Sequence, residues 1–326
     1  MTGGKTVLTI ATGKKLYVDM AVNLARSFRL WHQENDEISF HLATDLPQCI
    51  PDNVKNHVRI IQLEPDQLGK GFSPKLHLDK LAPPGQTLFI DSDCLVYSNL
   101  NPVFEAFKGH NVSVAGTYIA GGEWFGDVAS VCKKFDIPHL PKFNGGLYYL
   151  EAGPKSKLVY ETARKLEKEY DDIGFVRLRN HPNDEVLMAL AMELNHESPV
   201  TDDGSILAEF VNFQSGIKSD LLNGTVKLYN DPAHPDYQKN WHLTLASPVV
   251  VHYLGHHNMV MPYIREVRQL KYIMSDGYPI GISRFLTFLG VTLPAEIAKH
   301  FKNILRPVYK TFMGTRQVKK SERIVD

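Results

Sequence analysis

Residues 87–93 read TLFIDSD, an apolar run that ends in two aspartates one residue apart. Such a run is typical of a buried strand, and open α/β sheets bind their ligands at the carboxyl ends of strands. A regular strand would point Asp91 and Asp93 to opposite sides, but a turn after the strand lets both reach one cation. A hard divalent ion such as Mn²⁺ or Mg²⁺ takes oxygen ligands from carboxylates and from substrate phosphates. The stretch therefore predicts a metal site.

The sequence on either side of this stretch alternates between strand and helix patterns. Apolar runs predict strands at residues 6–11, 38–43, 58–63, 145–150 and 249–253. Three-four spacing of apolar residues and helix-start signals predict helices at residues 16–31, 75–81, 154–170 and 183–194. This order predicts an α/β fold with a mixed, mostly parallel sheet flanked by helices.

The pattern changes near residue 259 to helical segments with a basic bias. We therefore expect a catalytic domain at residues 1–258 and a C-terminal helical, basic extension at residues 259–326. The extension carries an apolar stripe flanked by basic residues: Ile297, Phe301, Ile304, Leu305 and Val308, with Lys299, Lys302, Arg306, Lys310, Lys319 and Lys320. Such a segment, over residues 296–320, can lie on an anionic membrane, although Pro307 interrupts it. The alternative is that the stripe packs on the first domain and the lysines are solvated.

Composition excludes several classes of protein. The counts of Lys+Arg and of Asp+Glu are both 36, so no overall field favours a nucleic-acid partner. The three cysteines, Cys49, Cys94 and Cys132, show no C-x-x-C spacing, which argues against a disulfide framework or a zinc ribbon and fits a reducing cytosol. We find no run of about 18 apolar residues and no signal segment, so we expect a cytoplasmic protein, peripheral at most on the inner face of the membrane.

A D-x-D pair after a strand has other interpretations. It can cap the following turn, or it can belong to a metal-dependent phosphatase or nucleotidyltransferase. In phosphatases of the haloacid dehalogenase type the first aspartate is the nucleophile. In that class we would expect Gly-Thr or a similar pair after the motif, whereas here Cys94 and Leu95 follow it. The motif also follows a late strand of the chain instead of the first one, and both observations disfavour that class.

Four blocks, in order over about residues 5–258, carry a more specific pattern. They are TIAT at residues 9–12 followed by Tyr17, SPKL at 73–76 followed by DSD, FNGG at 143–146, and HYLG at 252–255, with NDE at 183–185 between the last two. In these blocks the chain resembles family eight retaining glycosyltransferases of the GT-A type, the group that includes glycogenin and bacterial lipopolysaccharide galactosyltransferases.

The resemblance implies a GT-A (Rossmann-like) nucleotide-diphospho-sugar transferase fold and a UDP-sugar donor. The implied donor-binding residues are Ala11, Thr12, Tyr17, Lys75, Asp91, Ser92, Gly145, Gly255 and His257. Tyr17 would stack on the base, and Lys75 would lie near the ribose, diphosphate or sugar. Without the resemblance, Tyr17 could equally pack on the sheet, and Lys75 could be an exposed lysine at a helix start.

The resemblance also implies the metal ligands and the catalytic residues. Asp91, Asp93 and His252 would hold Mn²⁺ or Mg²⁺. The amide of Asn144 would hydrogen-bond sugar hydroxyls, and Asp184 would do so beside the anomeric carbon. At a helix start, however, an acidic residue can also be an ordinary cap.

Two positions depart from the family pattern. Glu185 replaces a glutamine, and a carboxylate there could act as a nucleophile. Asn258 replaces a lysine that contacts the diphosphate, so His256, His257 or Arg265 supplies the charge or the activity is weak. A catalytically weak sugar-nucleotide-binding protein thus stays open beside a retaining hexosyltransferase of polysaccharide or lipopolysaccharide biosynthesis. The acceptor, whether carbohydrate, lipid-linked or protein, is not encoded in any local pattern.

Overall fold

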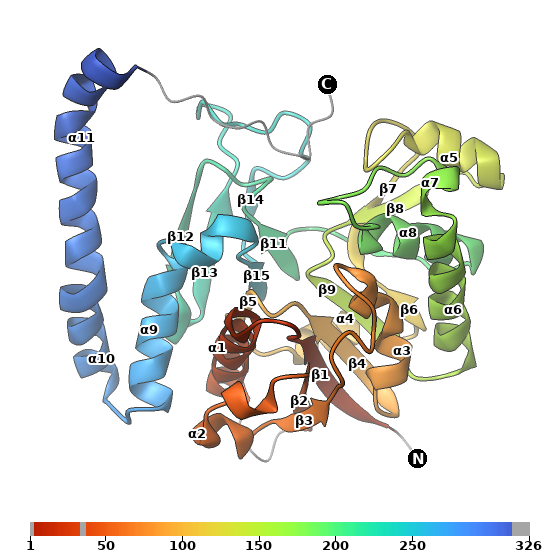
Figure 1. The fold of residues 1–326 in the computed structure, drawn as a ribbon, viewed down its shortest axis with the longest axis horizontal. Helices are drawn as coiled ribbons and strands as arrows, with labels where there is room; N and C mark the ends of the chain where they lie inside the picture. Colours follow the sequence, from red (N-terminus) through yellow and green to blue (C-terminus); the bar gives the residue numbers. More distant parts are fainter. Residues whose placement is uncertain (1–2, 33–36, 315–326) are drawn as a thin grey trace. The chain divides into compact units, whose positions relative to one another are not determined.

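The computed structural model describes residues 3–32 and 37–314 (Figure 1). By compactness the chain divides into two units, Met1–His256 and His257–Asp326. The sequence placed this division two residues later, after residue 258. Each unit is described by itself.

The first unit is built on a six-stranded sheet (Figure 1). Its strands are β1 Gly4–Ile10, β2 Ile38–Thr44, β3 Arg59–Gln62, β4 Gly85–Ile90, β6 Val112–Ser113 and β9 Leu147–Glu151. Their order is β3-β2-β1-β4-β9-β6, in which the first four are parallel and β9 runs antiparallel to both of its neighbours. The predicted mixed, mostly parallel sheet is therefore confirmed.

Alternate residues of the central strands bury their side chains on opposite faces of the sheet. Val7 of β1 and Leu88 of β4 belong to one apolar cluster, together with α1 Lys15–Trp31. Their neighbours Leu8 and Phe89 belong to a second cluster, which includes side chains of α6 Pro154–Lys168 and α8 Asp184–Leu194. Burial on both faces explains why these strands read as continuous apolar runs in the sequence.

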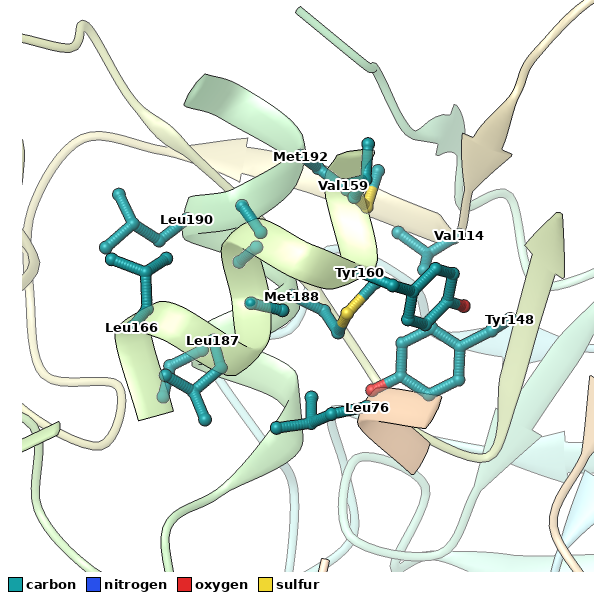
Figure 2. Close-up of a cluster of buried hydrophobic side chains, with 14 of the residues drawn as sticks. Leu76, Val114, Tyr148, Val159, Tyr160, Leu166, Leu187, Met188, Leu190 and Met192 are labelled. Atoms are coloured by element: carbon teal, nitrogen blue, oxygen red, sulfur yellow. The ribbon is translucent and has the colours of Figure 1, made fainter. Parts of the chain in front are cut away.

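The second cluster supports the region where the aspartates lie. Figure 2 shows part of it, with Leu76, Tyr148, Tyr160 and Met188 gathered among the side chains of α6 and α8. Every residue of α8 from Val186 to Met192 is fully buried. A helix that is apolar all round is an internal one, so the start of α8 is held rigidly against the sheet.

Three small sheets complete the strands of this unit. They comprise β10 Val200–Thr201, β7 Ala115–Ile119 and β8 Leu140–Phe143; β11 Leu207–Glu209, β15 Val250–His252 and β5 Cys94–Val96; and β12 Gly216–Asp220, β13 Thr225–Tyr229 and β14 Leu245–Ala246. Sequence analysis foresaw only β15 among these strands.

Short helices connect the strands of the first unit. They are η1 Pro47–Cys49, α2 Asp52–Lys55, η2 Ser73–His77, α3 Leu78–Leu81, α4 Asn101–Ala106, α5 Val128–Phe135, α7 Tyr170–Ile173 and η3 Leu221–Asn223. The helix predicted at residues 75–81 is thus two pieces, η2 and α3. The Pro83-Pro84-Gly85 sequence ends it, because a residue before proline is pushed out of the helical region.

Helices are the regular elements of the described part of the second unit. The 3₁₀ helix η4 Gly255–Met259 spans the division, and α9 Tyr263–Met274, α10 Ile280–Thr287, the π-helical turn η5 Phe288–Thr292 and α11 Leu293–Met313 follow. Pro307 lies inside α11, so the expected interruption there is wrong. Lys319 and Lys320 of the basic segment lie outside the described residues, as do the side chains of Val308 and Lys310.

One expectation about membranes needs correction. The continuous helix Ile280–Pro307, of 28 residues, is long and apolar enough to cross a bilayer, by length and composition only. The expectation that no such segment exists is therefore wrong. The serine, threonine and glycine residues interspersed in this segment conceal it from a search for unbroken apolar runs.

Candidate functional site

The two aspartates lie on a turn at the carboxyl end of β4. The amide of Cys94 donates to the carbonyl of Asp91 at 3.0 Å, and the amide of Ser92 donates to Asp91 Oδ1 at 3.1 Å. His252 Nε2 lies 3.0 Å from Asp93 Oδ1 and 4.0 Å from Asp91 Oδ2. The three residues predicted as metal ligands therefore face one another.

His252 reaches this turn because β5 and β15 pair. The two strands are antiparallel, and their register places Cys94 opposite His252. The amide of Tyr253 also donates to the carbonyl of Asp93 at 3.0 Å. Two short strands, far apart in the sequence, thus bring the histidine next to the aspartates.

Asn144 fixes the orientation of the His252 ring. Its Oδ1 lies 2.9 Å from the amide nitrogen of Gly146 and 2.7 Å from His252 Nδ1. Because a backbone N–H can only donate, the atom facing Gly146 must be the amide oxygen, and that oxygen can bond His252 only if Nδ1 carries a hydrogen. In neutral imidazole the lone pair then lies on Nε2, the atom that faces Asp93.

This arrangement fits a cation between His252 and Asp93. Asp93 Oδ1 is buried and has no hydrogen-bond donor in the described part of the chain, although His252 Nε2 is 3.0 Å away. Two acceptors at this distance repel unless a positive charge lies between them, either a proton or a metal ion. Burial alone would lower the pKa of His252, but the charges of Asp93 and Asp91 outweigh it and raise that pKa. In turn, burial alone would raise the pKa of Asp93, but His252 holds it below its usual range.

Cys94 lies close to the same group without being a suitable ligand for a hard ion. One ligand atom from each of Asp93, Cys94 and His252 falls within 4.8 Å of the others. The Cys94 thiol, however, faces the carbonyl of Gly146 at 3.8 Å, and burial raises its pKa well above the usual value. A neutral thiol is not among the oxygen-rich donors that Mg²⁺ or Mn²⁺ prefers.

Lys75 connects the aspartate turn to the start of α8. Its Nζ lies 2.7 Å from Asp91 Oδ2, 2.8 Å from the carbonyl of Gly145 and 3.7 Å from Asp184 Oδ2. Burial alone would lower the pKa of Lys75, but Asp184 and Asp91 together raise it, so the amine stays charged. The alternative of an exposed lysine at a helix start is therefore wrong.

The N-terminus of α8 contributes two more carboxylates. Asn183 is the cap, since its Oδ1 accepts from the amide of Glu185 at 2.8 Å, and Asp184 is therefore free of the capping role. Asp184 is almost fully buried and accepts a hydrogen bond of 2.5 Å from the Tyr148 hydroxyl. Burial raises the pKa of Asp184, while Lys75 and Tyr148 favour its charged form.

The paired glycines of the FNGG block make close contacts with the side chains of the site. A Cβ atom on Gly146 would lie 2.6 Å from His252 Nδ1 and 2.9 Å from Asn144 Oδ1. One on Gly145 would lie 3.0 Å from Asp184 Oδ2, and the amide of Gly145 donates to Glu185 Oε1 at 2.9 Å. A Cβ atom on Gly146 would therefore displace His252 or Asn144, whereas one on Gly145 would require a small shift of Asp184 or Glu185.

The first block lies at the same edge of the sheet, because β1 and β4 are parallel neighbours. Ala11 is buried, with its amide bonded to the carbonyl of Ala43, and the amide of Gly13 donates to both oxygens of Asp45. The Tyr17 side chain is 40% exposed, with Lys14 Nζ 5.9 Å from its ring centre. The alternative in which Tyr17 packs on the sheet is therefore wrong.

The remaining residues predicted to bind the donor are Thr12, Ser92, Gly255 and His257. Thr12 is half-buried beside Ala11, and Ser92 is buried in the aspartate turn. Gly255 has a φ of 66°, which favours glycine. His257 belongs to the second unit, so no position relative to the aspartates is assigned to it.

Sequence analysis missed Tyr148 and Asp45. Tyr148 follows the FNGG block by two positions and reads as an ordinary strand residue. Asp45 could have been found from the sequence, because it directly follows β2 and so lies at the same edge of the sheet as Asp91, which directly follows β4.

Comparisons with known proteins find similarity in structure alone. No family model and no curated protein matches the chain. The apo bifunctional glycosyltransferase WbbM aligns over 82% of this chain and 50% of its own, with 12% identity and a TM-score of 0.51. The galactosyltransferase LgtC, in complex with donor and acceptor sugar analogues, aligns over 77% and 87%, with 14% identity and a TM-score of 0.49. Mouse xyloside xylosyltransferase 1 aligns over 79% and 99%, with 14% identity and a TM-score of 0.47.

At such low identity the likeness to WbbM shows the fold alone. The chain has the predicted GT-A type of fold, a mixed α/β structure whose central sheet is rich in parallel strands and flanked by helices.

Proposed function

We propose that the chain is a metal-dependent glycosyltransferase that moves a sugar from a UDP-sugar to an acceptor with retention of anomeric configuration. The observation that carries the proposal is the convergence of Asp91, Asp93 and His252 at the carboxyl end of a central strand. Lys75 and Asp184 extend this group along the same edge. Such an edge is where open α/β sheets bind nucleotides.

Asp91, Asp93 and His252 would hold a divalent ion, Mn²⁺ or Mg²⁺. When bound, the ion acts as a Lewis acid and neutralises negative charge on a leaving nucleoside diphosphate. Asn144 holds His252 with Nε2 toward the aspartates, so the ring needs no reorientation to act as a ligand. The fixed charge of Lys75 favours a phosphate group at this end of the sheet.

The other residues of the blocks act on the donor. Tyr17 is exposed and offers a ring face for stacking on a base, beside backbone of Ala11 and Thr12. Asp184, held by Tyr148, would accept hydrogen bonds from sugar hydroxyls. Ser92, Gly145, Gly255 and His257 complete the proposed donor set.

Retention allows two mechanisms, which Glu185 distinguishes. In a front-face displacement the leaving diphosphate takes the proton of the acceptor hydroxyl, whereas in a double displacement Glu185 first forms a covalent bond to the sugar. We favour the first, because Glu185 Oε1 already accepts from the Gly145 amide at 2.9 Å. Glu185→Gln keeps an oxygen for that amide, so near-normal turnover in this variant would exclude the nucleophile.

We also propose that the protein acts in the cytoplasm. All three cysteines are free thiols, which agrees with a reducing cytoplasm. The acceptor would be a carbohydrate, a lipid-linked sugar or a protein.

Thermal unfolding with UDP and Mn²⁺, separately and together, tests the proposal. At about a hundredfold excess over its Kd, a ligand stabilises the folded chain by about 2.7 kcal/mol, which is a shift of several degrees. The pair should stabilise wild type but not Asp93→Asn, while the exposed control Asp172→Asn should behave as wild type. Turnover of UDP-sugars then completes the test.

Other outcomes favour the alternatives. A phosphatase or nucleotidyltransferase would release phosphate or pyrophosphate and show no joint stabilisation by UDP and Mn²⁺. A catalytically weak binder, with Asn258 as the reason, would show the shift and no turnover with any UDP-sugar.

A further inference from the structure

Helix α10 has its polar and apolar faces reversed relative to a helix of a water-soluble protein. Its buried side chains are Ser283 and Thr287, and the Ser283 hydroxyl donates to the carbonyl of Gln269 in α9 at 3.1 Å. Ile282 and Phe285, in contrast, are exposed, Phe285 by 61%. Water favours the opposite arrangement, so the outer face of α10 is suited to an apolar medium.

The exposed apolar face continues beyond α10 into η5 and α11. We call it the apolar helix surface; its members are Ile280, Ile282, Phe285, Phe288, Leu289, Leu293, Ile297, Phe301, Ile304, Leu305 and Tyr309. Along α11 the positions 293, 297, 301, 304 and 305 recur at three-four spacing and so share one face. An apolar surface of this length is far more than the scattered exposed residues of an ordinary monomer.

Basic residues accompany this surface. Lys299, Lys302 and Arg306 follow one another at intervals of three and four, on the face of α11 opposite the apolar positions. From residue 280 to 313 the sequence holds five Lys or Arg residues and a single acid, Glu296. The charge is complementary to anionic headgroups, which attract each such residue by about 1 kcal/mol near a bilayer surface.

The geometry favours an orientation in the plane of the bilayer. A spanning helix needs roughly 20 mainly apolar residues and is apolar all round. Here α10 packs on α9 along a polar face, and α11 has a basic face opposite its apolar one. A helix with these two faces lies at the interface between headgroups and acyl chains.

We propose that residues 280–309 bind an anionic lipid bilayer in its plane, with the apolar helix surface inserted and Lys299, Lys302 and Arg306 at the lipid phosphates. The surface begins at Ile280, well before the basic stripe at residues 296–320 that the sequence indicated. This inference stands on the second unit alone and does not depend on the chemistry of the first.

Sedimentation of the full chain with lipid vesicles tests this. We expect strong binding to vesicles of phosphatidylcholine mixed with phosphatidylglycerol and weak binding to phosphatidylcholine alone. Neutralising Lys299, Lys302 and Arg306 to Gln should lower the partition coefficient on mixed vesicles on the order of a hundredfold. The matched control carries Lys→Gln at three exposed positions of α6, Lys155, Lys165 and Lys168, and should bind as wild type.

The apolar part of the surface is tested separately. Ile282→Ser, Phe285→Ser and Leu289→Ser, combined, should abolish binding to both kinds of vesicle. The control Leu158→Ser, at a residue of α6 that is 50% exposed, should leave binding intact. Because all four side chains are exposed, circular dichroism and thermal unfolding of the variants should match wild type.

Three results would overturn the proposal. The first is equal sedimentation of wild type and both surface variants. The second is retention on the vesicles after alkaline carbonate washing, which indicates a spanning helix. The third is a dimer in light scattering that the serine variant dissociates, without vesicle binding by wild type, because a second copy would then cover the surface.

Discussion

Replacing Asn144 by alanine should weaken metal binding by a calculable amount. In the structure one oxygen, Asn144 Oδ1, accepts from both His252 Nδ1 and the amide of Gly146. Loss of a partner that orients a histidine ligand typically costs about 10- to 100-fold in metal affinity, or about 1.4 to 2.7 kcal/mol. We expect Asn144→Ala to fall in this range, and Asn144→Asp, which keeps an acceptor for both hydrogens, to stay near wild type.

The assay is a titration of Mn²⁺ into the protein at saturating UDP, with free Mn²⁺ followed by electron paramagnetic resonance. The change also leaves the amide of Gly146 without its partner, which should cost about 1 to 3 kcal/mol of folding stability. That loss is measured by denaturant unfolding in a chelator. Asn195→Ala is the control, because it removes a side-chain hydrogen bond to the carbonyl of Ala191 at the far end of α8.

Unchanged Mn²⁺ affinity in Asn144→Ala, together with a stability loss like that of the control, would refute the reasoning. Asn144 would then be only a turn residue. A variant that binds Mn²⁺ and UDP normally but not the UDP-sugar would instead support the sequence-based prediction that Asn144 contacts sugar hydroxyls.

Three further changes test other contacts of the site and of its support. Lys75→Met should cost about 3 to 5 kcal/mol in denaturant unfolding because it leaves buried carboxylates unpaired, whereas Lys14→Met at the surface should cost almost nothing. Gly146→Ala should cost about 1 to 3 kcal/mol and abolish Mn²⁺ binding through its clash with the imidazole, while Gly121→Ala, where a Cβ meets open space, should do neither. Burial lowers the pKa of His77 to about 4, so between pH 6.5 and pH 4 the unfolded chain binds a proton at this residue and the folded chain does not. The free energy of unfolding therefore decreases as the pH falls from 6.5 toward 4. His77→Gln should reduce this loss by about 1 kcal/mol, allowing for solvent screening of the partly buried side chain, in unfolding curves at pH 7 and pH 5.

The long elements of the fold were predictable because burial determines their pattern. The central parallel strands β1 and β4 are covered on both faces and so read as apolar runs, and α1 carries one apolar stripe. The small sheets were not predictable, because strands of two to five residues are too short to show a period. The most consequential omission was β5, whose residues Cys94–Val96 directly follow the aspartate turn.

The candidate metal ligands were identified by resemblance, but their mutual orientation could not be predicted from the sequence. Nothing local in the sequence indicates that Asn144 reaches His252, 108 positions away, or that Tyr148 reaches Asp184. Such contacts depend on side-chain torsions that tertiary packing sets. The sequence also left open whether the side chains of Lys75 and Tyr17 are buried or exposed. In the structure the Lys75 side chain is mostly buried and the Tyr17 side chain is exposed.

The charge balance of the site gives a reason to propose a bound metal ion that is independent of any resemblance. Within the described residues of the first unit, Asp91, Asp93 and Asp184 lie around the charged amine of Lys75, and burial raises the pKa of Asp184. A diphosphate bound at this edge would be repelled by the negative charge of these carboxylates. A divalent ion at His252 and Asp93 reverses that balance, since it is the largest local charge in any site that holds it. Joint stabilisation by UDP and Mn²⁺, rather than by either alone, therefore follows from the carboxylates themselves.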